Sequence, residues 1–240
     1  MIQFDMRQQN TRARYNLTAG IVVPRPIALI TSVNENGLVN AAPFSAFNFM
    51  GTDPPIVAFS PGLYSVNPTI PKDTRRNVLS TSEFVVNMVN EDLIEAMTIA
   101  GASFPPEVSE IEAMGVSLVP SVDVRPPRIA ESPAHLECKV VRDLDLGLNK
   151  IIFGEIIRIH IREDLIDLER LHIRYDKLNF VGRTAGGGGV FSRTKDLLIT
   201  PRITYDEIKA GTKISDLAPS AAQEVQATKT VEQRTSGRCL

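Results

Sequence analysis

The sequence has few of the features that identify a secreted or membrane-spanning protein. It contains two cysteines, Cys138 and Cys239, whose spacing forms neither a disulfide framework nor a metal site, which favours a reducing compartment. No apolar run approaches the roughly 18 residues that a membrane-spanning helix needs, and the polar N-terminus lacks the apolar core of a signal peptide. These absences predict a cytoplasmic protein with no membrane partner.

The chain also lacks a strong net charge and any clustering of its histidines. A formal net charge of -2 over 240 residues provides no global field for nucleic acid, so a phosphate-bearing ligand needs a local site. The three histidines, His135, His160 and His172, are scattered, and neither a Ser/His/Asp arrangement nor a metal spacing accompanies them. The sequence therefore gives no basis for a hydrolase or a metalloenzyme and predicts no nucleic-acid partner.

What the sequence does contain is a series of β-rich segments with few and short helical ones. The expected strands cover residues 27–33, 38–49, 55–62, 83–89, 132–144 and 149–164. The second of these is expected to be broken or bulged near Pro43, and the turn Asn34 to Gly37 makes a hairpin of the first two. At least six strands joined by hairpins and short links predict a mainly β fold, an antiparallel barrel rather than a doubly wound sheet.

Local patterns also predict the short helices and the faces of the strands. Asp73 or Thr74 is the expected N-cap of a helix that continues to Leu79, and Asn90 is the expected N-cap of a second helix. The apolar stripe of that second helix comprises Leu93, Ala96, Met97 and Ala100. Isoleucine alternates with charged residues over 157–162, which predicts a strand with one buried and one exposed face.

Small and polar residues occupy strand positions 40–46, where a regular strand would carry bulk. These residues are Asn40, Ala41, Ala42, Pro43, Ser45 and Ala46. Small side chains allow a planar aromatic ligand to approach the backbone closely, and the Ser45 hydroxyl is a candidate hydrogen-bonding group. A bulged barrel strand without a ligand accounts for the same pattern.

The segment "KDTRRN" combines a cation with the expected start of a helix. A helix N-terminus leaves its first N–H groups unpaired, and the ammonium of Lys72 beside it would complete a phosphate site. Asp73 opposes an anion unless it caps the helix; Arg75, Arg76 and Asn77 follow. The alternative is an ordinary capped helix with solvated surface cations.

Two further segments are candidates for ligand contact. Thr31 and Ser32 end the first strand, which Arg25 precedes, and their hydroxyls are candidates for hydrogen bonds to carbonyls or ring nitrogens of a ligand, although threonine favours strands in any case. The glycine run 186–189 offers room for a ligand or a partner chain, with Phe191 and Arg193 beside it, but a flexible linker explains it equally well.

The ordered set of these segments resembles the flavin reductase-like family. The segments are "VVPRPIALITSV", "NAAPFSAFNF", "DPPIVAFS", "KDTRRN", "EFVVNMV", "PPRIAESPAHLECKV", "GEIIRIHI" and "GGVFSRT". Each is weak alone, but eight in one order are specific. The resemblance implies a six-stranded Greek-key FMN-binding split barrel with a few short helices, a homodimer, and non-covalent FMN near the subunit interface.

The resemblance also assigns roles to individual residues. Positions that match cofactor-binding segments are Arg25, Thr31, Ser32, Ala42, Pro43, Ser45, Lys72, Asp73, Thr74, Asn77 and Arg193. The family commonly has an aromatic residue such as tyrosine before "RT" in its closing motif, where this chain has "VFSRT". The implied domains are an N-terminal arm (1–14), the barrel (15–202) and a C-terminal extension (203–240) that is expected to be mobile.

The function implied is an FMN-dependent oxidoreductase. Hydride would pass from NADH or NADPH to FMN, and electrons would continue to an acceptor or a partner monooxygenase. No catalytic side chain is assigned, because the cofactor performs the difficult step. Two alternatives stay open: an FMN-bound electron carrier of the flavoredoxin type without nicotinamide activity, and a non-catalytic flavin-binding barrel. The choice between NADH and NADPH, the acceptor, and how tightly FMN is held do not follow from the sequence.

Overall fold

The computed structural model describes residues 1–62, 71–186 and 189–217. The chain forms two compact units, residues 1–195 and 196–240. The expected boundaries at 14/15 and 202/203 remain predictions, although helix α1 (Thr11–Ile21) runs across the first of them. Cys239, the tail after residue 217 and part of the glycine run lie outside the described residues.

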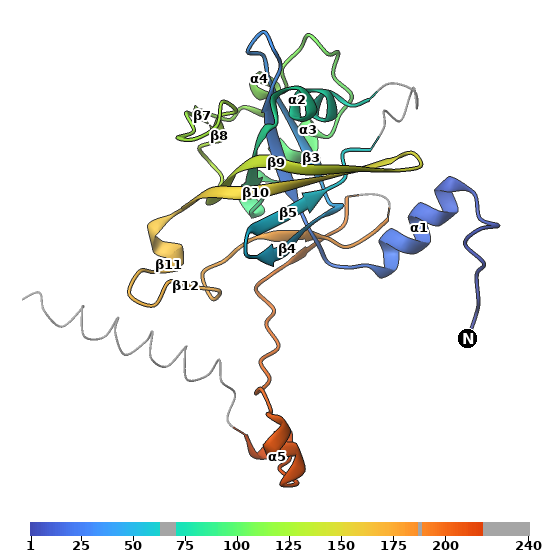
Figure 1. The fold of residues 1–240 in the computed structure, drawn as a ribbon, viewed down its shortest axis with the longest axis vertical. Coiled ribbons are helices and arrows are strands. Elements are labelled where there is room, and N and C mark those ends of the chain that lie inside the picture. The colour runs from blue at the N-terminus through green and yellow to red at the C-terminus, as the bar shows by residue number, and fades with distance from the viewer. Residues whose placement is uncertain (63–70, 187–188, 218–240) are drawn as a thin grey trace, which may run out of the picture. The chain divides into compact units, whose positions relative to one another are not determined.

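The first unit is built on one antiparallel sheet of seven strands in the order β3-β2-β6-β9-β10-β5-β4. The bounds are Val39–Phe44 for β3, Ala28–Val33 for β2, Glu83–Met88 for β6, Ala134–Leu146 for β9, Asn149–Ile161 for β10, Pro55–Phe59 for β5 and Phe47–Thr52 for β4. Figure 1 shows β9 and β10 as one long hairpin. The mainly β prediction is confirmed, but the sheet has seven strands where six were expected, and a Greek key is not established.

Shorter elements surround this sheet. Strands β1 (Arg25–Pro26), β13 (Val181–Arg183) and β14 (Phe191–Arg193) form a second sheet, β7 (Leu118–Val119) pairs with β8 (Arg128–Ile129), and β11 (Ile166–Asp167) pairs with β12 (His172–Ile173). The other helices of the described residues are α2 (Asp73–Thr81), α3 (Ile94–Ala100), α4 (Ile111–Met114) and α5 (Tyr205–Lys209), with 3₁₀ turns η1 (Glu91–Leu93), η2 (Glu163–Leu165) and η3 (Ile214–Asp216). None of the described helices has the length and apolar character needed to cross a membrane.

The expected strand over 38–49 is broken into two strands, β3 and β4, and the position of the break explains how the sheet closes. Pro43 lies within β3, opposite Leu29, and the break falls at Ser45 and Ala46. Strands β3 and β4 are the two edges of the sheet, yet only two residues separate them. A linker that short spans at most about 10 Å. The sheet must therefore curl until its edges approach, which is the closure of a barrel.

The sheet is buried on both faces near β2. Ala28 and Ile30 belong to an apolar cluster with Phe59 and Phe84, whereas Leu29 belongs to a second cluster formed with α3 and α4. The predicted apolar stripe is confirmed, since its four residues, Leu93 at the end of η1 and three in α3, are all buried in the second cluster. Because both faces are covered, every residue of β2 is buried, which includes its two hydroxyl residues.

The expected alternation at the end of β10 is only partly realised. A register shift falls between Ile156 and Arg158, and Ile157 and Ile159 are exposed. His160 makes a hydrogen bond to Glu137.

Candidate functional site

The first turn of α2 presents backbone N–H groups without a capping side chain. Lys72 is the N-cap residue, in an extended conformation (φ -60°, ψ 151°), and its side chain makes no capping hydrogen bond. The expectation that Asp73 or Thr74 caps the helix is wrong, because Arg76 pairs with the Asp73 carboxylate and the Thr74 hydroxyl donates to Asn40. Since no side chain of the described residues caps them, the N–H groups of this turn remain suited to an anion.

The Lys72 side chain adds a positive charge at the same place. It is half-buried, and its Nζ lies 5.6 Å from the centre of the Phe44 ring. Within the described residues its ammonium forms no ion pair. Burial lowers the pKa of Lys72, because a desolvated ammonium is disfavoured. A bound anion would compensate for that desolvation.

A cavity of about 120 Å³ lies beside Lys72. It brings together five residues that the sequence predicts as cofactor-binding: Ala42, Pro43, Lys72, Asp73 and Thr74. The end of α3 and the loop that follows it complete the wall. This volume is too small for a three-ring flavin, and it is suited to a phosphate or a short polar chain.

A buried polar network supports this cavity from behind. Asn40 donates from Nδ2 to Oε1 of Glu110 (2.7 Å), the backbone N–H of Ala41 donates to Oε2 (3.0 Å), and the Thr74 hydroxyl donates to Oδ1 of Asn40 (2.8 Å). Burial raises the pKa of Glu110, although the hydrogen bonds it accepts oppose that effect. The network orients the Asn40 amide and engages the hydroxyl hydrogen of Thr74. The Thr74 oxygen can therefore only accept a hydrogen bond from a ligand.

Ser32 and Asn77 lie deeper in the same network. Asn77 Nδ2 donates to Ser32 Oγ (3.3 Å), which in turn lies 3.4 Å from Asn40 Oδ1. Both side chains are buried, and neither lines the 120 Å³ cavity. Ser32 and Asn77 are therefore placed to orient Asn40 rather than to contact a ligand in the 120 Å³ cavity.

A larger cavity of about 330 Å³ adjoins the same segment at residues 45 and 46. Its lining is mostly apolar and comprises Val22, Pro24, Arg25, Pro26, Ser45, Ala46, Phe47, Asn48, Met50, Ala58, Phe59, Ser60 and Ile151. Pro43 lines the smaller cavity and Ser45 the larger one, and their two-residue separation corresponds to at most about 7 Å of backbone. The small residues of this segment therefore line a polar cavity at residues 42 and 43 and an apolar one at residues 45 and 46.

Arg25 lines the larger cavity, but its donors are engaged by the protein. The guanidinium donates to the carbonyl oxygens of Ala19, Val22 (2.8 Å) and Ala185 (3.1 Å), and Nε lies 3.4 Å from Ser45 Oγ. These contacts fasten the end of α1 and the loop after β13 to the barrel. The arrangement gives Arg25 a structural role at the edge of the cavity.

Thr31 and Arg193 are not brought to either cavity. Thr31 is buried and donates to the Pro127 carbonyl oxygen (2.6 Å), while Arg193 is exposed and pairs with Glu91 (2.7 Å). Among the described residues no group of three or more His, Cys, Asp or Glu side chains could hold a metal ion.

Sequence reasoning missed Glu110 and did not assign Asn40 to the site. Asn40 is one of several small or polar residues in its strand, and Glu110 lies 70 positions further along the chain in an unpatterned loop. No local signal marks such a partner, because the hydrogen bond exists only once α4 packs against β3.

Comparisons with known proteins agree with this architecture. Residues 20–179 match the family model described as a flavin reductase like domain. An uncharacterized protein of Deinococcus radiodurans is 38% identical over 207 residues, which are 84% of this chain and 90% of that protein. The structure of 2-nitrobenzoate 2-nitroreductase from Pseudomonas fluorescens is similar with a TM-score of 0.76 and 39% identity, covering 85% of this chain and 98% of that one. Nitrilotriacetate monooxygenase component B from Bacillus cereus follows with a TM-score of 0.75 and 29% identity, at 80% and 95% coverage.

Proposed function

Because the chain belongs to the flavin reductase-like domain family, we propose that it is an FMN-dependent oxidoreductase. In this proposal NADH or NADPH donates a hydride to FMN, and electrons continue to an acceptor. The observation that carries it is the pair of cavities that residues 42–46 line, a polar one beside Lys72 and an apolar one beside Ser45.

The residues present fit the two ends of FMN. The phosphate would be held by the Lys72 ammonium and by the first N–H groups of α2, which together form the charge-assisted contacts that phosphate prefers. The mostly apolar 330 Å³ cavity, with Phe47 and Phe59 in its lining, suits a flat aromatic ring system. Thr74 would accept from a hydroxyl of the connecting chain, since its own proton is engaged by Asn40.

FMN, when bound, would supply hydride acceptance and electron transfer, which no side chain can perform. The chain's own residues would bind and orient it. The apolar lining would limit access of water, and the backbone of residues 42–46 would set the approach of the ring. No acid–base side chain is required for this function, and none is assigned.

The similarity to a nitroreductase favours a second candidate for the electron acceptor. The chain is 39% identical to an enzyme whose name specifies 2-nitrobenzoate as its substrate. A nitroaromatic acid is therefore a candidate acceptor alongside a partner monooxygenase, which the similarity to a monooxygenase component B favours. The cytoplasmic location expected from the sequence also remains a proposal.

The test is a thermal-shift titration with FMN, followed by steady-state oxidation of NADH and NADPH. We expect added FMN to stabilise the protein, by about 2.7 kcal/mol when free FMN is a hundred times its dissociation constant. We expect oxidation of NADH or NADPH that depends on FMN. Adding 2-nitrobenzoate as the electron acceptor separates the nitroaromatic acid from a partner monooxygenase as the candidate acceptor. Bound FMN without nicotinamide oxidation would favour the electron carrier, and no stabilisation by FMN would refute the proposal.

We further propose a homodimer formed through the outer face of β4, β5, β9 and β10. Ile151 pairs with Leu144 and Phe153 with Ala58, and Ile151 and Ala58 line the larger cavity together with Met50. Met50 and Leu144 are 54% and 39% exposed. An apolar sheet face of this kind, adjoining the larger cavity, is suited to a second copy of the chain.

The double variant Met50→Lys/Leu144→Lys is expected to be a monomer with weaker flavin binding, because two charges would be buried in the interface. Light scattering after size exclusion and FMN titration measure the two effects. Leu168→Lys is the control, since Leu168 is 66% exposed in the β11–β12 connection. A wild-type monomer that binds FMN fully would contradict the shared interface.

A further inference from the structure

A third cavity, of about 670 Å³, lies between the β2–β3 turn and the β7–β8 hairpin, and we call it the hairpin cavity. Among the described residues it shares no lining residue with the two cavities of the proposed function. Its lining is mostly apolar and includes Val33, Val39, Leu118, Val119, Pro120 and Pro127. Small-molecule sites in proteins have volumes of about 300–1,000 Å³ and mostly apolar linings, so the hairpin cavity has the size and the surface of a binding site.

The first wall of this cavity, the β2–β3 turn, is held by hydrogen bonds of its own. Asn34 Oδ1 accepts from the backbone N–H groups of Asn36 and Leu38, both at 2.9 Å. The N–H of Gly37 donates to the Asn34 carbonyl oxygen (3.0 Å). The side chains of Glu35 and Asn36 also line the cavity, but neither makes a hydrogen bond to another described residue. The turn is therefore preorganised, and these two side chains are available to a ligand.

The second wall includes residues 120–127, and hydrogen bonds to the main sheet hold it. The Thr31 hydroxyl donates to the Pro127 carbonyl oxygen (2.6 Å). The backbone N–H and Nε of Arg125 both donate to Oε2 of Glu83 at 3.1 Å. The two terminal nitrogens of this guanidinium make no hydrogen bond within the described part of the chain. Glu83 thus orients the guanidinium and leaves its terminal N–H donors available.

The available polar groups carry charges of both signs. The terminal N–H groups of Arg125 can donate to a carboxylate, and the Glu35 carboxylate can accept from an ammonium. Glu83 already offsets the charge of Arg125, and Glu35 adds a negative charge, so a ligand that is only an anion would be repelled. A zwitterion with an apolar body suits both the charged groups and the apolar lining.

We propose that the hairpin cavity binds a zwitterion with an apolar side chain, its carboxylate on Arg125 and its ammonium on Glu35. Two sources have this chemistry, a free apolar amino acid and a short apolar peptide. A free amino acid carries both charges on one carbon atom, whereas a peptide separates them by about 3.3–3.6 Å for each added residue. The inference goes beyond the proposed function and requires no flavin.

The experiment measures by calorimetry the binding of leucine and of leucyl-leucine to the full-length wild-type protein without added flavin. We expect binding, and the ligand that binds more tightly identifies the source. The acetylated form of that ligand lacks the ammonium, and the amidated form lacks the carboxylate. Each is expected to bind about tenfold or more weakly, since a hydrogen bond to a charged group contributes at least that factor.

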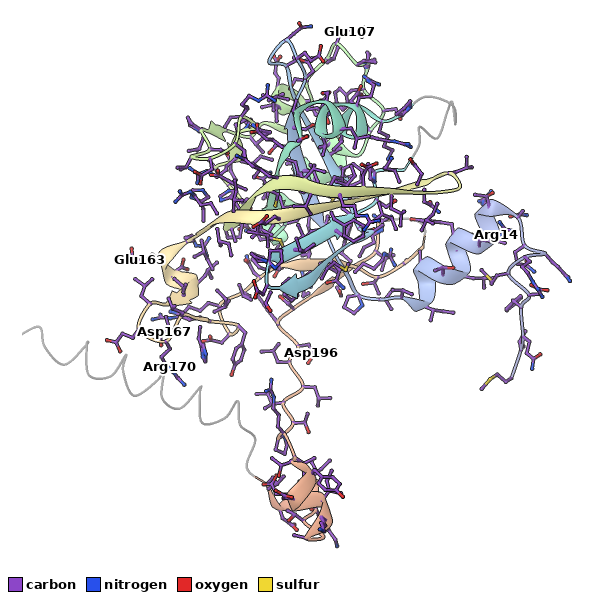
Figure 2. The ribbon with its side chains drawn as sticks, in the orientation of Figure 1. Arg14, Glu107, Glu163, Asp167, Arg170 and Asp196 are labelled. Atoms are coloured by element: carbon purple, nitrogen blue, oxygen red, sulfur yellow. The ribbon has the colours of Figure 1, made fainter. Side chains whose placement is uncertain are left out.

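Two variants test the residues. Arg125→Ala is expected to weaken binding about tenfold or more. Glu35→Gln is expected to have a similar effect, and it leaves the fold intact because the Glu35 carboxylate has no partner among the described residues. Arg170→Ala is the matched control, because Arg170 is also exposed and lies on the β11–β12 connection, well apart from β7 and β8 (Figures 1 and 2).

Three outcomes would overturn the proposal. The first is that neither leucine nor leucyl-leucine binds. The second is that Arg125→Ala and Glu35→Gln bind as tightly as Arg170→Ala. The third is that the acetylated or the amidated form binds as tightly as the zwitterion, which would show that one of the two charges has no part in recognition.

Discussion

Replacing Lys72 by alanine is expected to weaken FMN binding by about 10- to 100-fold, since a hydrogen bond to a charged group contributes roughly 1.5–3 kcal/mol. Lys72 is the cation of the smaller cavity, at the uncapped start of α2. The loss should appear in the dissociation constant of FMN and far less in the turnover of FMN-loaded protein, because the phosphate lies away from the reacting ring. Fluorescence titration of FMN measures the first quantity.

Two further variants separate the charge of Lys72 from its packing on Phe44. Lys72→Met keeps an apolar chain over the ring but removes the ammonium, and it is expected to lose nearly as much affinity as alanine. Lys139→Ala is the control, because Lys139 is exposed on β9. If Lys72→Met binds FMN as tightly as the wild type, the ammonium has no part in phosphate binding.

The lowered pKa of Lys72 adds a pH dependence to the same measurement. Only the protonated amine attracts the phosphate, and burial shifts its pKa below the ordinary lysine value of 10.5. Affinity for FMN should therefore fall as the pH rises through that lowered pKa, and Lys72→Met should lack this alkaline decline. The bound phosphate itself raises the pKa of Lys72, so the affinity for FMN begins to fall at the lower pKa of the free protein.

Replacing Glu137 by alanine is expected to destabilise the fold by about 3 kcal/mol or more, because each buried hydrogen-bond donor left unsatisfied costs roughly 1–3 kcal/mol. The carboxylate is fully buried in β9. It accepts hydrogen bonds from the N–H groups of Val122 (2.9 Å) and Asp123 (2.7 Å) and lies 2.6 Å from His160 Nε2. Alanine would leave these donors unsatisfied and release the segment that covers the sheet, which denaturant unfolding would measure.

Glu131→Ala is the matched control for Glu137. Its carboxylate also accepts from a backbone N–H, that of Ser117 at 2.9 Å, but it is exposed to water. Water can replace this hydrogen bond, so the free energy of unfolding should fall by about 1 kcal/mol or less. Equal destabilisation by the two substitutions would show that burial is not the cause.

Glu137 also predicts how stability changes in acid. Burial alone would raise its pKa, but the hydrogen bonds from Val122, Asp123 and His160 outweigh it and hold the pKa below the ordinary glutamate value of 4.5. Its contribution is therefore complete above pH 4.5 and lost as the pH falls through the lower folded-state pKa. Glu137→Gln should show a weaker loss of stability over that acidic range than the wild type.

Local patterns in the sequence are sufficient for many of the elements and for the family. The strand Glu83–Met88 and the buried stripe of α3 follow from periodicity, because the repeat of side chains along a strand or helix decides which of them face the core. The order of the weak segments, none informative alone, also identifies the family. Ala42, Pro43, Lys72 and Thr74 line one cavity, as expected of segments whose residue types suit a phosphate or a close backbone approach.

The extent of the cavity-lining group and the residues that support it depend on how the elements pack. The break at Ser45 connects β3 and β4, which are distant in sheet order. Arg25 donates to the carbonyl oxygen of Ala185 and Asn40 donates to Glu110, and these bonds join residues that are distant in sequence. A side chain's type states which hydrogen bonds it can make, but its partner depends on which elements pack together. Periodicity carries no information about that choice, so the sequence determined the parts and the packing determined the site.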